Sequence, residues 1–275
     1  MSGWRRTLGA LGYGLRVGLP RTAGIYGASV VLFAVLCWAM VLKASQLPID
    51  GQPRWIDYAL NAYAGIRTPV PGAVIAVPMA WLLPQLLLCL IVASSPFRSV
   101  SSQGLQVLLR AGSRLSWWTA MWGWTLLGVL GFYLGAVLVW CVFGLFTGGL
   151  CGVPQDFLEL ALNGLNVAGL SPGQVQLALL ACVATSLALA MVQIVLSVLI
   201  HPLAAFVAAV AYYIVSTLVT TKWLVGDHAM VARNKLFDEH GTSSATMLLV
   251  AASIAVVALV IGFLAFRRRS ILPRE

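Results

Sequence analysis

The sequence predicts an all-α integral membrane protein with six transmembrane helices, both termini in the cytoplasm and an amphipathic interfacial helix before the first span. Hydrophobic residues make up 60% of the 275 residues, and charged residues only 9%. The mean hydropathy is +0.94. A soluble domain of this length needs a more highly charged surface. The apolar residues also lie in continuous runs, which excludes the alternating pattern of a membrane β-barrel.

Six apolar runs are each long enough for a helix that crosses a hydrocarbon core about 30 Å thick. They are Gly24–Lys43, Ala73–Ala93, Trp117–Phe146, Val175–Val198, Leu203–Thr221 and Thr246–Phe266. Only residues 199–202 separate the fourth run from the fifth, and Pro202 there indicates a tight turn. The alternative is five spans, one of them a long kinked helix from 175 to 221.

The charges predict the orientation of these helices. The N-terminal segment, the loop 94–116 and the C-terminal tail together carry a net charge of +10, and the remaining loops carry −1. Basic loops remain in the cytoplasm. We therefore expect a plasma-membrane protein with both termini inside. No compact basic domain is present to bind nucleic acid.

Residues 1–22 are expected to form the interfacial segment, and residues 23–275 the six-helix domain. Apolar residues recur at spacings of three and four through the first 22 positions, with arginines off the stripe. This pattern is typical of a helix that lies on the membrane surface. The stripe consists of Trp4, Leu8, Leu11, Leu15 and Leu19. Five glycines in the same segment favour the alternative, a disordered basic tail.

The cytoplasmic loop 94–116 contains a candidate short helix that ends near Arg110. Ser101 or Ser102 is positioned to cap it. Its apolar face would consist of Leu105, Leu108 and Leu109, with Arg110 and Arg114 following. Such a face fits the groove of a partner protein, whereas the alternative is a helix that lies flat on the membrane.

The outer loops also contain candidate structure. Trp55–Tyr63 and Phe157–Leu165 are candidate interfacial helices in the first and third loops. The outer loop 222–245 is the most polar stretch of the chain, and it either turns back into the protein or is solvated.

The interior of the predicted bundle offers few reactive groups. Asp and Glu are absent from all six runs, which disfavours proton relays built on carboxylates. Gln85 and Gln193 either bond across helices or line a substrate path. Gly128, Gly131 and Gly135 favour close helix packing, either within the chain or at a seam with a second copy.

The motifs of common enzymes and metal sites are absent from the sequence. There is no HExxH metal motif, no CxxC pair and no GxxxxGK[ST] phosphate loop. We therefore expect no metal site and no cofactor in this chain, and no catalytic residue. An intramembrane enzyme remains the weakest hypothesis, supported only by His201 between the fourth and fifth runs. The chain therefore moves a substrate passively, has a structural role, or uses a separate ATPase.

The run 106–114, QVLLRAGSR, followed by Trp117–Trp118, resembles the corresponding loop of ABC-2 type exporter permeases. The layout is similar too, with a basic interfacial helix, six spans, internal termini and a longer outer segment before the last span. In that family a short coupling helix in this loop meets a separate ATP-binding subunit.

The resemblance implies a permease subunit of an exporter that uses ATP bound by its partner. Leu105, Leu108 and Leu109 would fill a groove of the ATP-binding subunit. Arg110 and Arg114 would meet acidic residues or anionic membrane lipid. A second six-span half, the same chain or a related one, would complete the path. The competing hypothesis is a non-transporting membrane scaffold or accessory subunit, because no charged group is expected inside the membrane.

Overall fold

The computed structural model describes residues 3–46, 52–67, 77–97, 108, 113–151, 165, 167, 169–219, 221 and 224–268. Within these ranges the chain forms seven α-helices and two short 3-10 helices, and no strand element. The helices are α1 (Gly3–Ser45), α2 (Trp55–Tyr63), α3 (Met79–Ala93), α5 (Arg114–Phe146), α7 (Pro172–Leu199), α8 (Pro202–Leu218) and α9 (Ser244–Arg268), with η1 (Val225–Ala229) and η2 (Val231–Arg233) before α9. The prediction of an all-α chain is confirmed for these residues.

Four helices, α1, α5, α7 and α9, are long and apolar enough to cross a membrane. The apolar helices α3 and α8 have only 15 and 17 residues, fewer than the roughly 20 that a full crossing needs. Each of the six predicted runs therefore contains a helix, but only four of these helices have the length of a full span. Residues 73–76, the expected start of the second run, lie outside the described residues.

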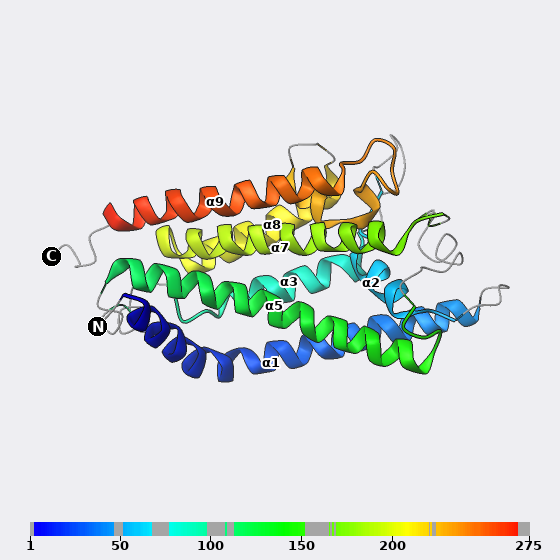
Figure 1. Cartoon of the computed structure of the whole chain (residues 1–275), viewed down its shortest axis with the longest axis horizontal. Helices are drawn as coiled ribbons and strands as arrows, with labels where there is room; N and C mark the ends of the chain where they lie inside the picture. Colours follow the sequence, from blue (N-terminus) through cyan, green and yellow to red (C-terminus); the bar gives the residue numbers. More distant parts are fainter. Residues whose placement is uncertain are drawn as a thin grey trace.

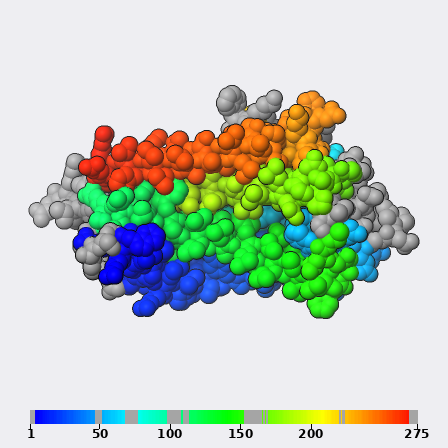
Figure 2. Space-filling model, viewed as in Figure 1, coloured from blue at the N-terminus to red at the C-terminus, as the bar shows by residue number. Residues whose placement is uncertain are grey.

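The long helices run side by side along the long axis of the molecule (Figure 1). Helix α7 is the central element, since it packs against α3, α5, α8 and α9, whereas α1 packs mainly on α5. Figure 2 shows α9, α7, α5 and α1 as bands along one face. The first residues of α1 and the last of α9 lie at one end of the bundle, together with the start of α5. We call this end the termini end.

Helix α1 corrects the expectation of a separate interfacial helix over residues 1–22. It continues as one helix from Gly3 to Ser45, with Pro20 inside it. Figure 1 shows α1 bent in its first half. Proline explains a bend because it removes one hydrogen bond of the helix and its ring displaces the preceding turn.

The predicted leucine stripe is not the main packing face of this first half. Trp4, Leu8 and Leu19 are exposed, while Leu11 and Leu15 are only partly buried. The buried side consists of small residues four apart: Ala10, Gly14, Gly18 and Thr22. A Cβ at Gly14 would overlap the ring of Phe97, and a Cβ at Gly18 would overlap Trp124 of α5. Small residues therefore let this segment pack closely against the bundle.

Aromatic packing holds the second half of α1 to α5. The ring of Phe33 lies 5.4 Å from that of Phe132 and 5.7 Å from that of Trp140. The opposite sides of both helices expose large apolar residues, among them Val31, Trp38 and Leu138. An apolar exterior around a packed interior is what a helix in contact with lipid requires.

The turn expected between the fourth and fifth runs is present. Helix α7 ends at Leu199 and α8 begins at Pro202. His201 caps α8, since its Nδ1 accepts a hydrogen bond from the backbone N–H of Leu203 at 3.2 Å. The alternative of one helix from 175 to 221 is therefore wrong, and His201 has a structural role.

Candidate functional site: a buried cap on a polar interior

Two segments fold back into the bundle at the end opposite the termini end (Figure 1). They are residues 52–67, which contain α2, and residues 224–243, which contain η1 and η2. We call them together the cap. Ile56, Ala59 and Leu60 are completely buried, and every residue from 226 to 234 is buried. The middle of the most polar stretch of the sequence is thus folded into the protein, whereas Lys235, Glu239 and His240 are exposed.

Helix α2 begins at a capping box formed by its own residues, and the residue before its N-cap is hydrogen-bonded to the end of α5. The carboxylate of Asp57 accepts a hydrogen bond from the backbone N–H of Arg54 at 2.7 Å, as in a capping box. The hydroxyl of Thr147, just after α5, donates to the carbonyl of Pro53 at 2.6 Å. The expected helix Trp55–Tyr63 is therefore present, but it is buried rather than interfacial.

Direct backbone contacts join the two cap segments. The N–H of Ala232 donates to the carbonyl of Ala64 at 2.9 Å. Gly65 follows Ala64 at this contact, and its φ is +68°. A Cβ at this position would lie 2.5 Å from Cγ of Met230. Only glycine meets both conditions, a left-handed backbone and a close approach.

A buried ion pair fastens the cap to the end of α8. The guanidinium of Arg233 donates to the carboxylate of Asp227 at 2.5 Å and to the carbonyl of Ser216 at 2.7 Å. Its Nε also donates to the carbonyl of Ile66 at 3.1 Å. The side chains of Arg233 and Asp227 are 3% and 7% exposed. The guanidinium of Arg233 therefore donates hydrogen bonds to a carboxylate, to a carbonyl in the last turn of α8 and to a carbonyl of the other cap segment.

Burial dominates the electrostatics of this pair. Desolvation raises the pKa of Asp227 to about 6, against the opposing attraction of Arg233 and a hydrogen bond from the N–H of Thr221. Desolvation also lowers the pKa of Arg233, against the attraction of Asp227. Removal of one member of such a pair typically costs about 3–5 kcal/mol, because the other charge stays buried.

Further hydrogen bonds attach the cap to α3 and α9. The indole N–H of Trp81, a fully buried residue of α3, donates to the carbonyl of Ala229 at 2.7 Å. The side-chain amide of Asn234 donates to Oγ of Ser244 at the start of α9, at 2.8 Å. The cap is thus bonded to α3, α5, α8 and α9, and movement of these helices would disturb it.

Neutral polar side chains line the contact between α3 and α7. Oγ of Ser186 donates to Oε1 of Gln85 at 3.2 Å, and Nε2 of Gln193 donates to the carbonyl of Cys89 at 2.9 Å. Both glutamines are buried. The two candidate residues for a substrate path therefore bond across α3 and α7 in this structure.

Three buried groups near the cap lack partners of hydrogen-bond geometry. They are the hydroxyls of Tyr63 and Tyr133, whose rings lie 5.8 Å apart, and both ring nitrogens of His228. Burial lowers the pKa of His228, so its imidazole is neutral near pH 7. Unpaired buried polar groups are costly and often mark functional sites. Among the described residues, no group of three or more His, Cys, Asp or Glu side chains is placed to hold a metal ion.

The candidate coupling residues are only partly visible. Leu105, Leu109 and Arg110 lie outside the described residues. Leu108 is 9% exposed and belongs to the hydrophobic core of the chain. It is therefore not free to fill the groove of a partner in this structure.

Arg114 also has an intramolecular role. Its guanidinium donates to the carbonyls of Phe266 and Arg267 at the end of α9, and it lies 6.0 Å from the centre of the Phe266 ring. A cation at the C-terminus of a helix pairs with its last carbonyls. Arg114 thereby ties the start of α5 to the end of α9.

The glycine row of α5 faces α1. The hydroxyl of Tyr26 donates to the carbonyl of Gly128 at 2.9 Å. A Cβ at Gly131 would also meet Tyr26, and one at Gly135 would meet Val30. These three glycines therefore lie against α1 of the same chain.

Sequence reasoning missed the ion pair of Asp227 and Arg233 and the unpaired tyrosines. The signal for the pair was weak, since an acid and a base six residues apart in a polar stretch are usually solvated. Tyr63 and Tyr133 resemble ordinary interfacial and core aromatics in the sequence.

A family model described as "Protein of unknown function (DUF2705)" matches residues 31–272 of the chain. No curated protein and no solved structure matches the chain. The matched range includes both cap segments and all helices except the first part of α1.

Proposed function

The chain belongs to the DUF2705 family, and from that premise we propose that it is the membrane permease subunit of an ABC-2 type exporter, driven by a separate ATP-binding subunit. The observation that carries the proposal is the contrast between the two ends of the bundle. One end presents exposed arginines, and the other is closed by a buried cap.

The termini end has the charge expected of a cytoplasmic surface. Among the described residues it presents Arg5, Arg6, Arg267 and Arg268 as exposed cations. The sequence between α3 and α5, with the candidate coupling residues, joins helices that meet at this same end. Basic loops favour the cytoplasm, where an ATP-binding subunit would be found.

The cap would serve as the outer closure of a path through the bundle. Helices α3 and α8 are shorter than a full span, and the cap lies at the end of the bundle opposite the termini end. No carboxylate lies in α3, α5, α7, α8 or α9. Coupling to a proton or ion gradient would usually require one there. An external source of energy therefore suits this interior better.

Co-purification tests the proposal. The full chain, carrying an affinity tag, is isolated in mild detergent from membranes of its own host. We expect an ATP-binding subunit and ATP hydrolysis in the same fraction. Leu105→Asp with Leu109→Asp should abolish both, because charged side chains would oppose insertion into an apolar groove. Leu150→Asp, at an exposed leucine of the opposite end, is the matched control.

Two results would contradict the proposal. The first is a tagged chain that purifies intact without any ATPase. The second is ATPase recovery that the double variant does not change, although its elution profile equals that of the control. Either result would favour the scaffold or accessory subunit instead.

A further inference from the structure

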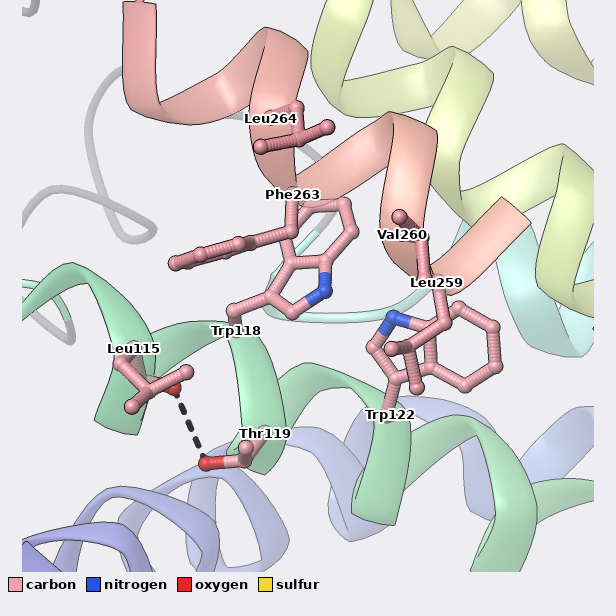
Figure 3. A pocket seen from close by; sticks show the side chains of 8 residues that line it. All are labelled: Leu115, Trp118, Thr119, Trp122, Leu259, Val260, Phe263 and Leu264. Carbon is pink, nitrogen blue, oxygen red and sulfur yellow. Dashed lines mark hydrogen bonds between the residues drawn. The ribbon is translucent and has the colours of Figure 1, made fainter. Parts of the chain in front are cut away.

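A cavity of about 290 Å³ lies between the first half of α5 and the last half of α9, near the termini end. Figure 3 shows Trp118 and Trp122 on α5 facing the apolar side chains of α9. The lining includes Leu115, Leu259, Val260 and Leu264, all of which are also exposed on the outside of the bundle. The cavity is therefore open to the surroundings of the bundle and almost entirely apolar.

Two indole nitrogens without partners border this region, and the other polar side chain of the lining, Thr119, donates its hydroxyl hydrogen to the carbonyl of Leu115. Trp118 is 2% exposed, and Nε1 of both Trp118 and Trp122 is buried without an acceptor. The two residues are one helical turn apart. In Figure 3 their nitrogens lie on the ring edges that face the space between the two indoles. Buried N–H donors are rarely left unpaired, so their placement points to an acceptor that enters from outside.

Cations border the same site at the termini end. Arg267 and Arg268 are exposed at the end of α9, about one turn beyond Leu264. Arg114 lies one turn before Trp118 on α5 and is bound to the last carbonyls of α9. On both helices the arginines therefore lie nearest the termini end, and the two indoles of α5 and the apolar side chains of α9 lie further along the bundle.

This order matches the layers of a phospholipid. We propose that the groove of α5 and α9 is a binding site for an anionic glycerophospholipid of the leaflet at the termini end. Its acyl chain lies against Val260 and Leu259, an ester carbonyl accepts from the indole N–H groups, and its phosphate meets Arg267 and Arg268. Indole and arginine side chains at these depths are typical of membrane interfaces. The site is independent of whether the chain exports a substrate.

Photolabelling of the full chain in vesicles tests the site. The vesicles are phosphatidylcholine with a trace of phosphatidylglycerol whose acyl chain carries a diazirine. We expect label concentrated on residues 115–122 and 259–264, above the level on the exposed side chains within residues 30–38 of α1, which are Val30, Val31, Val35 and Trp38. Excess unlabelled phosphatidylglycerol should remove this label, whereas excess phosphatidylcholine should not.

Two pairs of variants separate the chain pocket from the charge. Val260→Trp fills the groove and should abolish the excess label, while Val256→Trp, one turn earlier at another exposed valine of α9, should preserve it. Arg267→Gln with Arg268→Gln should lower the preference for the anionic probe roughly tenfold. Arg5→Gln with Arg6→Gln, at exposed arginines of α1, should leave that preference unchanged.

Three results would overturn the proposal. Label in the groove no higher than on residues 30–38 would mean that no site exists. Equal competition by phosphatidylcholine would remove the role of the arginines. Cross-links to a second protein chain in place of lipid would assign the groove to a protein partner.

Discussion

The arginines Arg5, Arg6, Arg267 and Arg268 at one end of the bundle and Arg233 at the other end lie in opposite surroundings. At the termini end, Arg5, Arg6, Arg267 and Arg268 are exposed. At the cap end, Arg233 and Asp227 are buried together and bonded to three different parts of the chain. Exposed arginines favour one orientation in a membrane at little cost to stability, while the buried pair is one of several attachments that hold the cap to the bundle. The comparison shows that charged residues can serve two purposes: exposed arginines favour one orientation in a membrane, and a buried ion pair holds separate segments of the chain together.

The largest effect should follow from removal of the cation of the cap. Arg233→Met leaves the carboxylate of Asp227 and the carbonyl of Ser216 buried without their donor. We expect a loss of about 3–5 kcal/mol of stability, measured as a lower midpoint of thermal unfolding in detergent. Lys235→Met removes an exposed cation two residues away and should have almost no effect.

A double variant tests whether the loss of stability comes from an unpaired buried charge or from disturbed packing of the core. Asp227→Leu with Arg233→Met replaces both charges by apolar groups and should recover part of the loss, since an apolar pair needs no partner. Equal midpoints for Arg233→Met and Lys235→Met would show that the pair does not hold the cap.

The next largest effect should come from Gly65→Ala. Alanine there requires a left-handed backbone, which costs about 1–3 kcal/mol, and its Cβ would also overlap the side chain of Met230. Gly169→Ala is the matched control, because Gly169 has a similar φ of +75° but open space around it. Thermal unfolding of the two variants separates backbone strain from the contact with Met230. If both variants lose the same stability, the contact between the cap segments contributes nothing.

Acidification should weaken the cap through His228, by a smaller amount. The pKa of His228 is lowered from 6.5 in the folded chain, so the unfolded state binds more protons between that lowered pKa and 6.5. The stability due to this residue is complete above about pH 6.5 and is lost as the pH falls through this window. The thermal midpoint, measured from about pH 7.5 to about pH 5, should fall more for the natural chain than for His228→Phe.

Asp227 contributes with the opposite sign, since its pKa is raised and its protonation is favoured in the folded chain. The comparison with His228→Phe keeps Asp227 in both proteins and isolates the histidine. A pH dependence that is unchanged in His228→Phe would show that the buried imidazole plays no part.

The smallest effect should come from the termini end. Arg5→Gln with Arg6→Gln removes two exposed cations, and surface substitutions of this kind change stability by no more than about 0.5 kcal/mol. We expect the thermal midpoint to stay within experimental error, in contrast to Arg233→Met. A loss comparable to that of Arg233→Met would erase the distinction between the two ends.

Local patterns in the sequence were sufficient to locate the helices. Continuous apolar runs identified the six main helices, Pro202 marked the turn before α8, and α2 has the expected bounds of Trp55–Tyr63. These features depend on residues close together in the chain. The continuity of α1 through Pro20 was missed, because close packing of Gly14 and Gly18 supports the bent helix only once Phe97 and α5 are in place.

The cap could not be predicted in the same way. A polar stretch such as residues 222–245 is buried only where distant groups satisfy its charges. Arg233 donates hydrogen bonds to Ile66, Ser216 and Asp227, and no local pattern in the sequence predicts these partners. Arg114 is a similar case, since its partners in α9 lie 152 and 153 residues away.

The pairing of the two cap segments also dictates an order of assembly. The hydrogen bond from Arg233 to Ile66 spans 167 residues. A ribosome that adds about 5–20 residues per second needs roughly 10 to 30 s to produce the second segment after the first. During that interval the carbonyls of Ala64 and Ile66 lack the donors that Ala232 and Arg233 later provide. Closure of this end is therefore one of the last events in the biogenesis of the protein.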